Sequence, residues 1–290
     1  MKQFFSLLSF IAISSMAISQ KVSGKLKFEQ GQIFDVSIRV KNNISQQAMG
    51  QTIDFNVDAS GNHSYKVTNT TDDNCTLNHT VQRITFAFDG MGQKRTFDSN
   101  VEKDVNGQFG KPIKDLLAKK YDIIIDPTGK TLMTIPEKIQ LAQTDSRLAI
   151  VTTMLKDVLD IVQPPQKGKG SFFKVLPETE TGKEETWTES TINENGKFDA
   201  AYTISAITDS IIVVDFVATA LTISKAEMMG SETTTTLTNK STGKIILDRA
   251  IGIMKEKTIT TNSNGNTEAS FGTLPVTSIP TTIITVKPIQ

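Results

Sequence analysis

The sequence predicts a mainly β protein, a curled antiparallel sheet or an open or half barrel built from two β-meanders, with one long helix docked on it. Two observations carry this prediction. Apolar and polar residues alternate along many short segments, which is the period of a half-buried strand. One segment, residues 145–162, instead repeats its apolar residues at the three- and four-residue steps of an amphipathic helix.

The predicted helix has clear start and stop signals. Thr144, Asp145 and Ser146 can each supply an N-cap oxygen, and Pro164-Pro165 prevent continuation. Its apolar stripe consists of Leu148, Val151, Leu155, Val158, Leu159 and Val162. We expect this stripe to pack on the sheet, because an isolated helix of this length is marginal in water.

The first predicted meander alternates over residues 34–40, 53–57, 75–81 and 84–88. The apolar positions change from odd to even numbers near Gln82-Arg83, which predicts a β-bulge or a strong bend. Ser60-Gly61-Asn62 has the composition of a turn, so we expect one strand to end there and its return strand to begin. Pro112 predicts the start of a short helix.

The second predicted meander begins at Thr186. Residues 211–223 are apolar on both faces, which indicates a central strand, and turns are expected at 239–243 and 262–266. The chain is thus predicted to hold a single domain, residues 20–290, made of two pseudo-repeats. The pseudo-repeats cover about 25–135 and 184–287 and are joined by a helical linker, 136–183. Both contain a Thr-Gly-Lys run, at 128–130 and 242–244. Either a duplication or the ordinary use of Thr-Gly-Lys in hairpin turns explains this match.

The N-terminus has the pattern of an export signal. Met1-Lys2 is a short basic region, residues 4–17 are apolar, and Ala17-Ile18-Ser19 predicts cleavage between Ser19 and Gln20. The expected mature protein is periplasmic or secreted. Because no cysteine lies near the cleavage point, we expect no lipid anchor, and no second apolar run reaches membrane-spanning length.

Composition narrows the classes of partner. Lys and Arg total 31, equal to Asp and Glu, so the charge gives no reason to expect nucleic acid. Cys75 is the only cysteine, which excludes an internal disulfide. Asp72 and Asp73 lie beside it and should raise the pKa of its thiol, which argues against a reactive cysteine.

Two patterns resemble metal sites and fail on detail. Asp54, Asn56 and Asp58 match the start of a calcium loop, but the sixth and twelfth positions are Ala59 and Tyr65. Cys75, His79 and His63 are too few ligands for a structural zinc site. No nucleophile–base pattern is present either, so the sequence predicts a non-enzyme with no metal and no cofactor.

The strands carry more aromatic side chains than one helix can cover. We therefore expect a concave binding surface bordered by Phe86, Phe88, Trp187 and Phe216, which would take an apolar small molecule, a lipid or a polypeptide such as an envelope protein. The alternative is direct packing of sheet on sheet without a cavity. The protein would then be a structural or interaction module of the cell envelope with no small-molecule site.

Several short segments carry a resemblance to known proteins. They are Leu26-Lys27-Phe28-Glu29-Gln30-Gly31, Asn43-Ile44-Ser45-Gln46, Met49-Gly50-Gln51, Met91-Gly92-Gln93, Thr186-Trp187, Gly196-Lys197-Phe198, Tyr202-Thr203-Ile204 and Thr242-Gly243-Lys244-Ile245. In this order they resemble a family of exported bacterial β-proteins with a domain of unknown function. The layout is also distantly similar to periplasmic lipoprotein carriers, whose curled sheet and covering helices enclose an apolar cavity. That likeness implies an architecture and cannot by itself assign a function.

Overall fold

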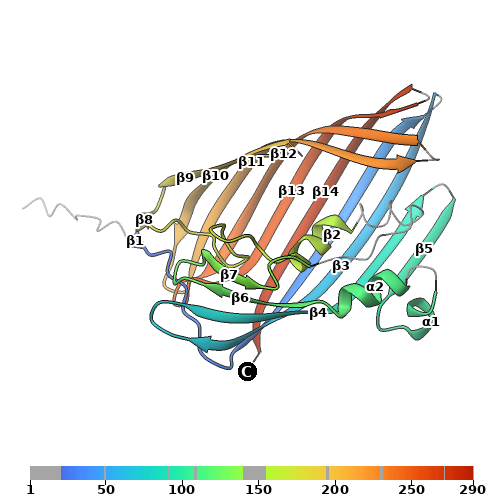
Figure 1. Ribbon diagram of the computed structural model, residues 1–290. Coiled ribbons are helices and arrows are strands. Elements are labelled where there is room, and N and C mark those ends of the chain that lie inside the picture. Colours follow the sequence, from blue (N-terminus) through green and yellow to red (C-terminus); the bar gives the residue numbers. More distant parts are fainter. Residues whose placement is uncertain are drawn as a thin grey trace, which may run out of the picture.

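The computed structural model describes residues 21–48, 50–90, 92–107, 110–139, 155–193, 196–228, 231–270 and 272–289, and it is mainly β, as predicted (Figure 1). Twelve strands form one antiparallel sheet, in the order β7-β6-β4-β3-β2-β14-β13-β12-β11-β10-β9, with β5 paired to β4. Their bounds are β2 Ile33–Ala48, β3 Gln51–Thr70, β4 Cys75–Gly90, β5 Gln93–Asp98, β6 Lys120–Ile125, β7 Thr131–Ile135, β9 Thr186–Asn193, β10 Gly196–Ile207, β11 Ile211–Met228, β12 Ser231–Asp248, β13 Met254–Ala269 and β14 Gly272–Ile289.

The remaining elements are short. They are β1 Lys21–Val22, paired with β8 Thr181–Gly182, the helices α1 Glu102–Val105, α2 Gly110–Leu117 and α4 Lys156–Leu159, and the 3-10 turn η2 Asp160–Val162. The helix expected from Pro112 corresponds to α2. No described helix is long and apolar enough to cross a membrane.

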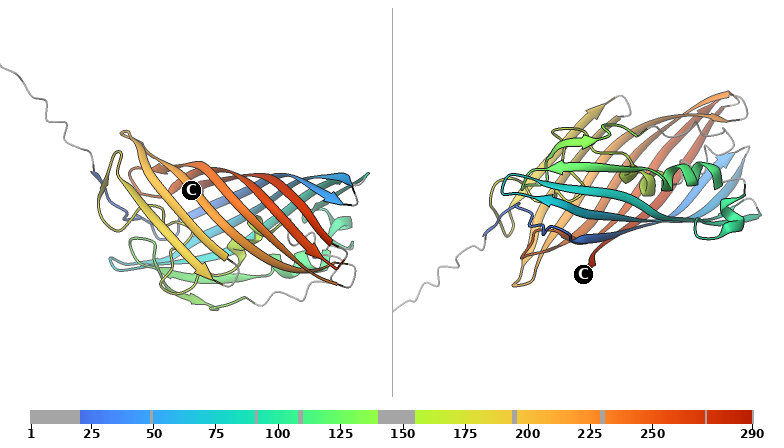
Figure 2. Two further views of the ribbon diagram at one scale, coloured as in Figure 1. Left: turned by 90° about the horizontal axis from the view of Figure 1, so that it is seen from above. Right: turned by 60° about the horizontal axis from the view of Figure 1, so that its bottom comes forward.

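The two meanders join into one sheet through strands from opposite ends of the chain. β2 pairs with β14 over most of its length, from Ile33 opposite Ile289 to Gln46 opposite Val276. The predicted central strand, 211–223, lies within β11, which pairs with β10 on one side and β12 on the other. The sheet curls but does not close, because β7 and β9 lie at its two ends (Figure 2).

The two faces of the curled sheet differ in chemistry. On β2, Phe34, Val36, Ile38 and Val40 are buried on the inner side, which we call the concave face. The alternate residues point to the other, convex face, where Arg39 Nε donates to Asp58 Oδ1 at 3.0 Å. Alternation of this kind places one face against the core and the other in water.

The predicted bulge is confirmed in β4. Arg83 pairs with Asn62 whereas Val81 pairs with the next residue, His63, so Gln82 is the extra residue. On its other edge, β4 pairs with β6 before the bulge and with β5 after it. The bulge therefore lies between the two parts of the β4 edge that have different partners.

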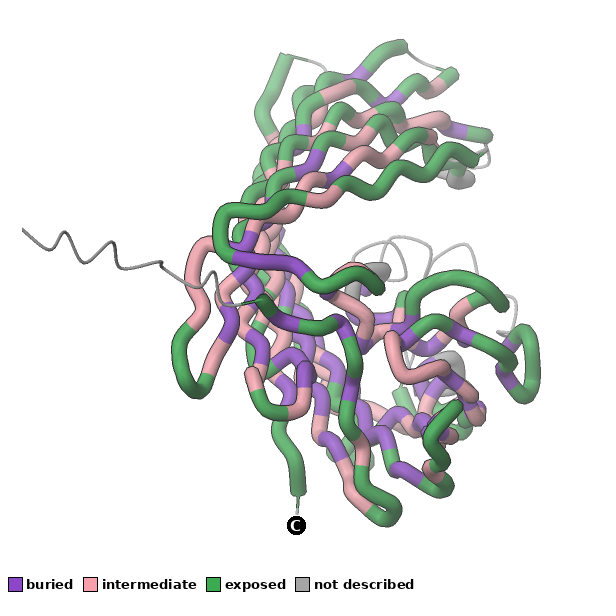
Figure 3. Tube along the Cα trace, turned by 90° about the vertical axis from the view of Figure 1, so that its left-hand side faces the viewer, coloured by how far each residue is buried: buried purple, intermediate pink, exposed green. Residues whose placement is uncertain are grey.

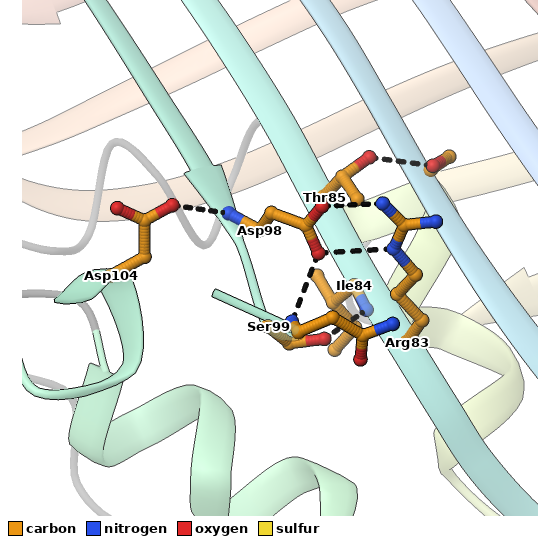
Figure 4. Close-up of polar contacts among 8 residues, drawn as sticks. Arg83, Ile84, Thr85, Asp98, Ser99 and Asp104 are labelled. Atoms are coloured by element: carbon orange, nitrogen blue, oxygen red, sulfur yellow. Dashed lines mark hydrogen bonds and ion pairs between the residues drawn. The ribbon is translucent and has the colours of Figure 1, made fainter. Parts of the chain in front are cut away.

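A cluster of polar contacts holds β5 and α1 against the end of β4 (Figure 4). The Arg83 guanidinium donates to both carboxylate oxygens of Asp98, with Nε–Oδ1 at 3.0 Å. The backbone N–H of Asp98 donates to Asp104 of α1, and that of Ile84 donates to the Ser99 hydroxyl. These contacts fix the chain at the point where the edge of β4 changes its partner from β6 to β5.

The single long helix predicted over 145–162 is wrong for the part that the structure describes. Residues 140–154 lie outside the described residues, and 155–162 form only α4 and η2. The chain becomes extended at Gln163, with ψ 129°, because Pro164 disfavours helical backbone in the residue before it. The described part of the apolar stripe is nevertheless buried: Leu155, Val158, Leu159 and Val162 belong to the core.

The turn predicted at Ser60-Gly61-Asn62 is also wrong, because β3 continues through it. Gly61 serves a different purpose there. A Cβ at Gly61 would lie 2.5 Å from Val158 Cγ1 and 2.8 Å from His63 Nε2. The glycine lets α4 approach the strand closely, which is a known use of glycine inside strands.

The turns predicted at 239–243 and 262–266 fall inside β12 and β13 in the same way. Gly243 lies between Phe216 and Ile259 on the neighbouring strands, and a Cβ there would lie 2.2 Å from the carbonyl oxygen of Thr258. Gly129, by contrast, has φ +82° in the turn between β6 and β7. The two Thr-Gly-Lys runs therefore occupy unlike positions, a turn and a strand.

The main core lies between the concave face and the segments that cover it. It includes residues of both meanders, such as Phe34, Ile84, Ile204 and Leu247, together with Phe173 and Leu176 from the segment before β8. Buried residues are concentrated in the lower part of Figure 3, and the upper arm of the sheet is mostly exposed or intermediate. The covered end of the concave face is where a site can be enclosed.

Candidate functional site

A pocket of about 470 Å³ lies between the concave face and the chain that follows α4. Its lining residues are Ile38, Tyr65, Tyr121, Ile123, Asp160, Ile161, Gln163, Pro164, Pro165, Gln166, Ser171, Phe172, Phe173 and Ile284. The volume is within the range of about 300–1,000 Å³ that is typical of sites for small molecules.

The sheet contributes one wall of the pocket from four strands. Ile38, Tyr65 and Ile284 come from β2, β3 and β14, which are neighbours in the sheet, and Tyr121 and Ile123 come from β6. The β2–β14 pairing sets Ile38 directly opposite Ile284. This wall therefore exists only because the first and last long strands of the chain pair with each other.

The opposite wall is made by residues 160–173, which we call the covering segment. Its aromatic side chains hold it to the sheet: the Phe172 ring stacks on Tyr65 with centroids 5.9 Å apart, and Phe173 meets Tyr65 edge-on at 5.1 Å. Pro164 and Pro165 belong to this wall, and Gln163 before them is extended, with ψ 129°. Most of the lining is thus apolar or aromatic.

A hydrogen-bond chain ties the sheet to the covering segment. Tyr121 Oη donates to the carbonyl oxygen of Ile161 at 3.0 Å, and the two tyrosine oxygens, Tyr65 Oη and Tyr121 Oη, are 3.2 Å apart. Since the Tyr121 proton is used on Ile161, Tyr65 must be the donor to Tyr121. Burial raises the pKa of both phenols, so both stay protonated and the chain keeps its direction.

Two buried histidines lie behind the tyrosines. His63 Nδ1 and His79 Nε2 are 3.1 Å apart, and neither side chain is exposed. The His79 ring stacks on Tyr121 at 4.4 Å and tilts against Tyr65 at 4.8 Å. Neither His63 Nε2 nor His79 Nδ1 has a hydrogen-bond partner among the described residues.

Burial lowers the pKa of His63 to about 4 and that of His79 to about 3. For His79 the neighbouring imidazole acts in the same direction, because two adjacent imidazoles cannot both be protonated cheaply. Both rings are therefore neutral near pH 7. A neutral pair fits a structural role in supporting the tyrosines rather than acid–base chemistry at the pocket.

The sequence-predicted border residues lie in other places. Phe86 is buried and stacks on Phe97, with centroids 5.2 Å apart. Phe88 is half-buried and stacks on Phe55 at 5.8 Å. Neither lines the pocket described above.

Trp187 and Phe216 are brought together through Tyr202 in a row across three neighbouring strands, which we call the aromatic row. Trp187 pairs with Tyr202, and Tyr202 pairs with Phe216. The ring centroids are 5.3 Å and 5.2 Å apart. Phe216 belongs to a small apolar cluster separate from the main core, and none of the three residues lines the pocket.

Two charged residues flank the aromatic row. Tyr202 Oη donates to Glu189 Oε2 at 3.3 Å, and Lys257 Nζ lies 5.5 Å from the centre of the Phe216 ring. Burial lowers the pKa of Lys257, and the Glu189 carboxylate acts in the opposite direction. The ammonium is thus placed for a cation–π contact on the concave face.

Cys75 and the metal candidates add no chemistry to the site. Burial, rather than the neighbouring acids, raises the pKa of the Cys75 thiol to about 11. Asp58 pairs with Arg39 on the convex face, in a continuous strand rather than a calcium loop. Among the described residues, no group of three His, Cys, Asp or Glu side chains is placed to hold a metal ion.

Sequence reasoning missed the residues that form the pocket. The sequence patterns single out Tyr65 only as a mismatch to the calcium loop, and they do not single out Phe172 or Phe173. The available signal was the spacing of Tyr65, His79 and Tyr121 on inward positions of β3, β4 and β6, where His79 pairs with both tyrosines. That signal requires the strand register, which alternation alone does not supply.

Comparison with solved structures gives remote likenesses. No protein-family model and no curated protein matches the chain. An outer membrane channel from Pseudomonas putida F1 aligns with 91% of this chain and 98% of its own, at 9% identity and a TM-score of 0.23. The crystal structure of OpdD from Pseudomonas aeruginosa aligns with 90% and 100%, at 7% identity and a TM-score of 0.27. At these scores the likeness carries no argument, and the family resemblance stays a prediction.

Proposed function

We propose that the chain is an exported, non-catalytic protein of the cell envelope that binds an apolar ligand, such as a lipid chain, in the pocket on its concave face. The observation that supports it is the lining itself: four strands and the covering segment converge on about 470 Å³ of largely apolar space. Enclosed apolar space with a few oriented polar groups is the usual form of a small-molecule site.

The polar groups of the pocket support binding rather than catalysis. The tyrosine hydroxyls are committed to each other and to Ile161, and their raised pKa values keep them from acting as bases near pH 7. The histidines behind them are buried and face each other. These groups position the walls of the pocket and supply no nucleophile–base pair.

A dye-binding experiment with a matched pair of variants tests this function. Ile284 lines the pocket, whereas its neighbour Ile283 is 41% exposed and lies on the alternate face of β14. Saturable binding of an environment-sensitive hydrophobic dye should be lost in Ile284→Glu and kept in Ile283→Glu. Far-ultraviolet circular dichroism checks that both variants fold.

Two results would count against the proposal. Either the native protein binds no dye, or both glutamate variants bind it equally well. Mass spectrometry of chloroform extracts from purified native protein provides a second readout, because a protein that binds lipid should carry some through purification. A structural module of the envelope is the remaining candidate if both measurements are negative.

A further inference from the structure

The described lining of the pocket contains a carboxylate but no positively charged side chain. Among the described residues that line it, Asp160 is the only ionisable group besides the two tyrosines, and Lys, Arg and His do not occur. Asp160 and Gln166 are exposed, so they lie where the head group of a bound amphiphile would reach water. A negative head group would meet a carboxylate there. The nearby cation on the concave face, Lys257, pairs with Ile284 in the sheet wall but does not line the pocket.

The hydrogen-bond donors of the lining are also mostly in use. The Tyr65 proton is used on Tyr121, the Tyr121 proton on Ile161, and Gln163 Nε2 donates to the carbonyl oxygen of Ile139 at 3.1 Å. What remains on the two phenol oxygens is acceptor capacity. A ligand hydroxyl or an ammonium can use an acceptor, and a carboxylate cannot.

Gln166 adds an exposed, neutral amide donor at the rim, and the buried exception is the Ser171 hydroxyl. Its oxygen is buried and has no hydrogen-bond partner among the described residues. A single neutral donor can serve an ester, ether or hydroxyl oxygen. It cannot offset the desolvation of an ionised carboxylate, which costs far more than that of a neutral oxygen.

We infer that this pocket takes an amphiphile whose head group is uncharged or positively charged, and that it discriminates against an anionic head group on the same apolar chain. The inference rests on the proposed function and adds the class of ligand. In this arrangement the apolar chain lies between Ile38, Ile123 and Ile284, and the head group lies at the rim beside Asp160 and Gln166.

Displacement of the hydrophobic dye by three amphiphiles with the same dodecyl chain tests the inference. Dodecyl maltoside, dodecyltrimethylammonium and dodecyl sulfate are each titrated below their critical micelle concentration, with circular dichroism at every point to exclude unfolding. We expect the neutral and cationic compounds to displace the dye and dodecyl sulfate to be weaker than either by at least fivefold. Raising the salt concentration should narrow the gap.

Charge variants at the rim locate the effect. Gln166→Lys and Asp160→Asn should each strengthen dodecyl sulfate relative to dodecyltrimethylammonium, by about two- to fivefold, as expected for one partly exposed charge. The matched control is Asp209→Asn, because Asp209 is fully exposed in the turn between β10 and β11, away from the lining. The control should leave the ratio of affinities unchanged.

The possible results separate the two proposals. If the dye or all three amphiphiles fail to bind, the proposed function fails and this inference fails with it. If dodecyl sulfate binds as well as the other two, binding stands and the inference is overturned. If the preference exists but Gln166→Lys and Asp160→Asn both leave it unchanged, the discrimination does not arise at this pocket, and the inference is likewise overturned.

Discussion

His63 and His79 face each other across neighbouring strands with Nδ1 and Nε2 3.1 Å apart, and both side chains are fully buried. His63 lies next to the close approach of α4 at Gly61, and His79 stacks on Tyr121, whose hydroxyl binds the covering segment. The histidine pair therefore lies between the α4 contact and the tyrosine that binds the covering segment. Protonation of either imidazole would affect the wall of the pocket.

Acid should destabilise the protein through this pair. The unfolded chain binds protons at these imidazoles below pH about 6.5, whereas the folded pKa values are about 4 and about 3. The unfolded state therefore binds more protons between these limits, so stability is full above pH 6.5 and falls as the pH drops. From pH 7.5 to pH 5 we expect a loss of about 2 kcal/mol per histidine in the free energy of unfolding.

The chain has only two histidines, which makes the measurement direct. In protein freed of any affinity tag, both imidazole Cε1–H proton signals should keep their positions down to pH 5 by NMR, while denatured protein titrates normally. Urea unfolding at both pH values gives the loss of stability. Titration of either signal near pH 6.5 in the folded protein would contradict the buried pair.

Gly61→Ala should destabilise the protein by about 1–3 kcal/mol, the usual cost of overpacking a core. The added methyl group would lie 2.5 Å from Val158 Cγ1, so α4 must move away from β3. Gly170→Ala is the matched control, because its Cβ would meet only the Lys174 side chain, at 3.4 Å or more. Denaturant midpoints compare the two, and equal midpoints would show that α4 is not held against the strand.

Much of the sheet was predictable because alternation is a local signal. The bulge at Gln82 is one example. The apolar positions of this strand change from odd to even numbers, and an inserted residue is the main explanation for such a change. The strand through Gly61 and the strand through Gly243 were missed for the converse reason. Glycine beside Ser, Thr or Asn is usual in turns, and only the tertiary neighbours, Val158 and Thr258, show that close approach is the cause.

The pocket was not predictable from local patterns. Ile38 and Ile284 are opposite each other only through the pairing of the first and last long strands, and Tyr121 reaches Ile161 across 40 residues of chain. Trp187 and Phe216 were selected as aromatic residues on strands, which they are. Counting aromatic residues could not show that Tyr202 would join them into a row outside the pocket.

Export remains a prediction from the N-terminal pattern. Protein recovered from the envelope or medium should begin at Gln20, after cleavage behind Ser19, and should carry no acyl group. Intact mass spectrometry of the exported protein measures both. A Ser19→Pro variant should be retained in precursor form, and a mature mass that includes residues 1–19 would refute the prediction.

The last prediction uses the single tryptophan to decide between the pocket and the aromatic row as the binding site. Trp187 stacks on Tyr202 and does not line the pocket. A bound amphiphile with a brominated chain quenches tryptophan on contact, so a ligand in the pocket should leave Trp187 emission nearly unchanged.

A tryptophan moved into the pocket provides the positive control. In a Trp187→Phe background, Phe172→Trp places the indole on the Tyr65 ring at the pocket wall, where Phe172 now stacks. Its emission should be quenched with the same saturation curve that dye displacement gives. Strong quenching of Trp187 in the native protein, with none at position 172, would place the binding site at the aromatic row. It would then agree with the sequence-based prediction that Trp187 and Phe216 border the site.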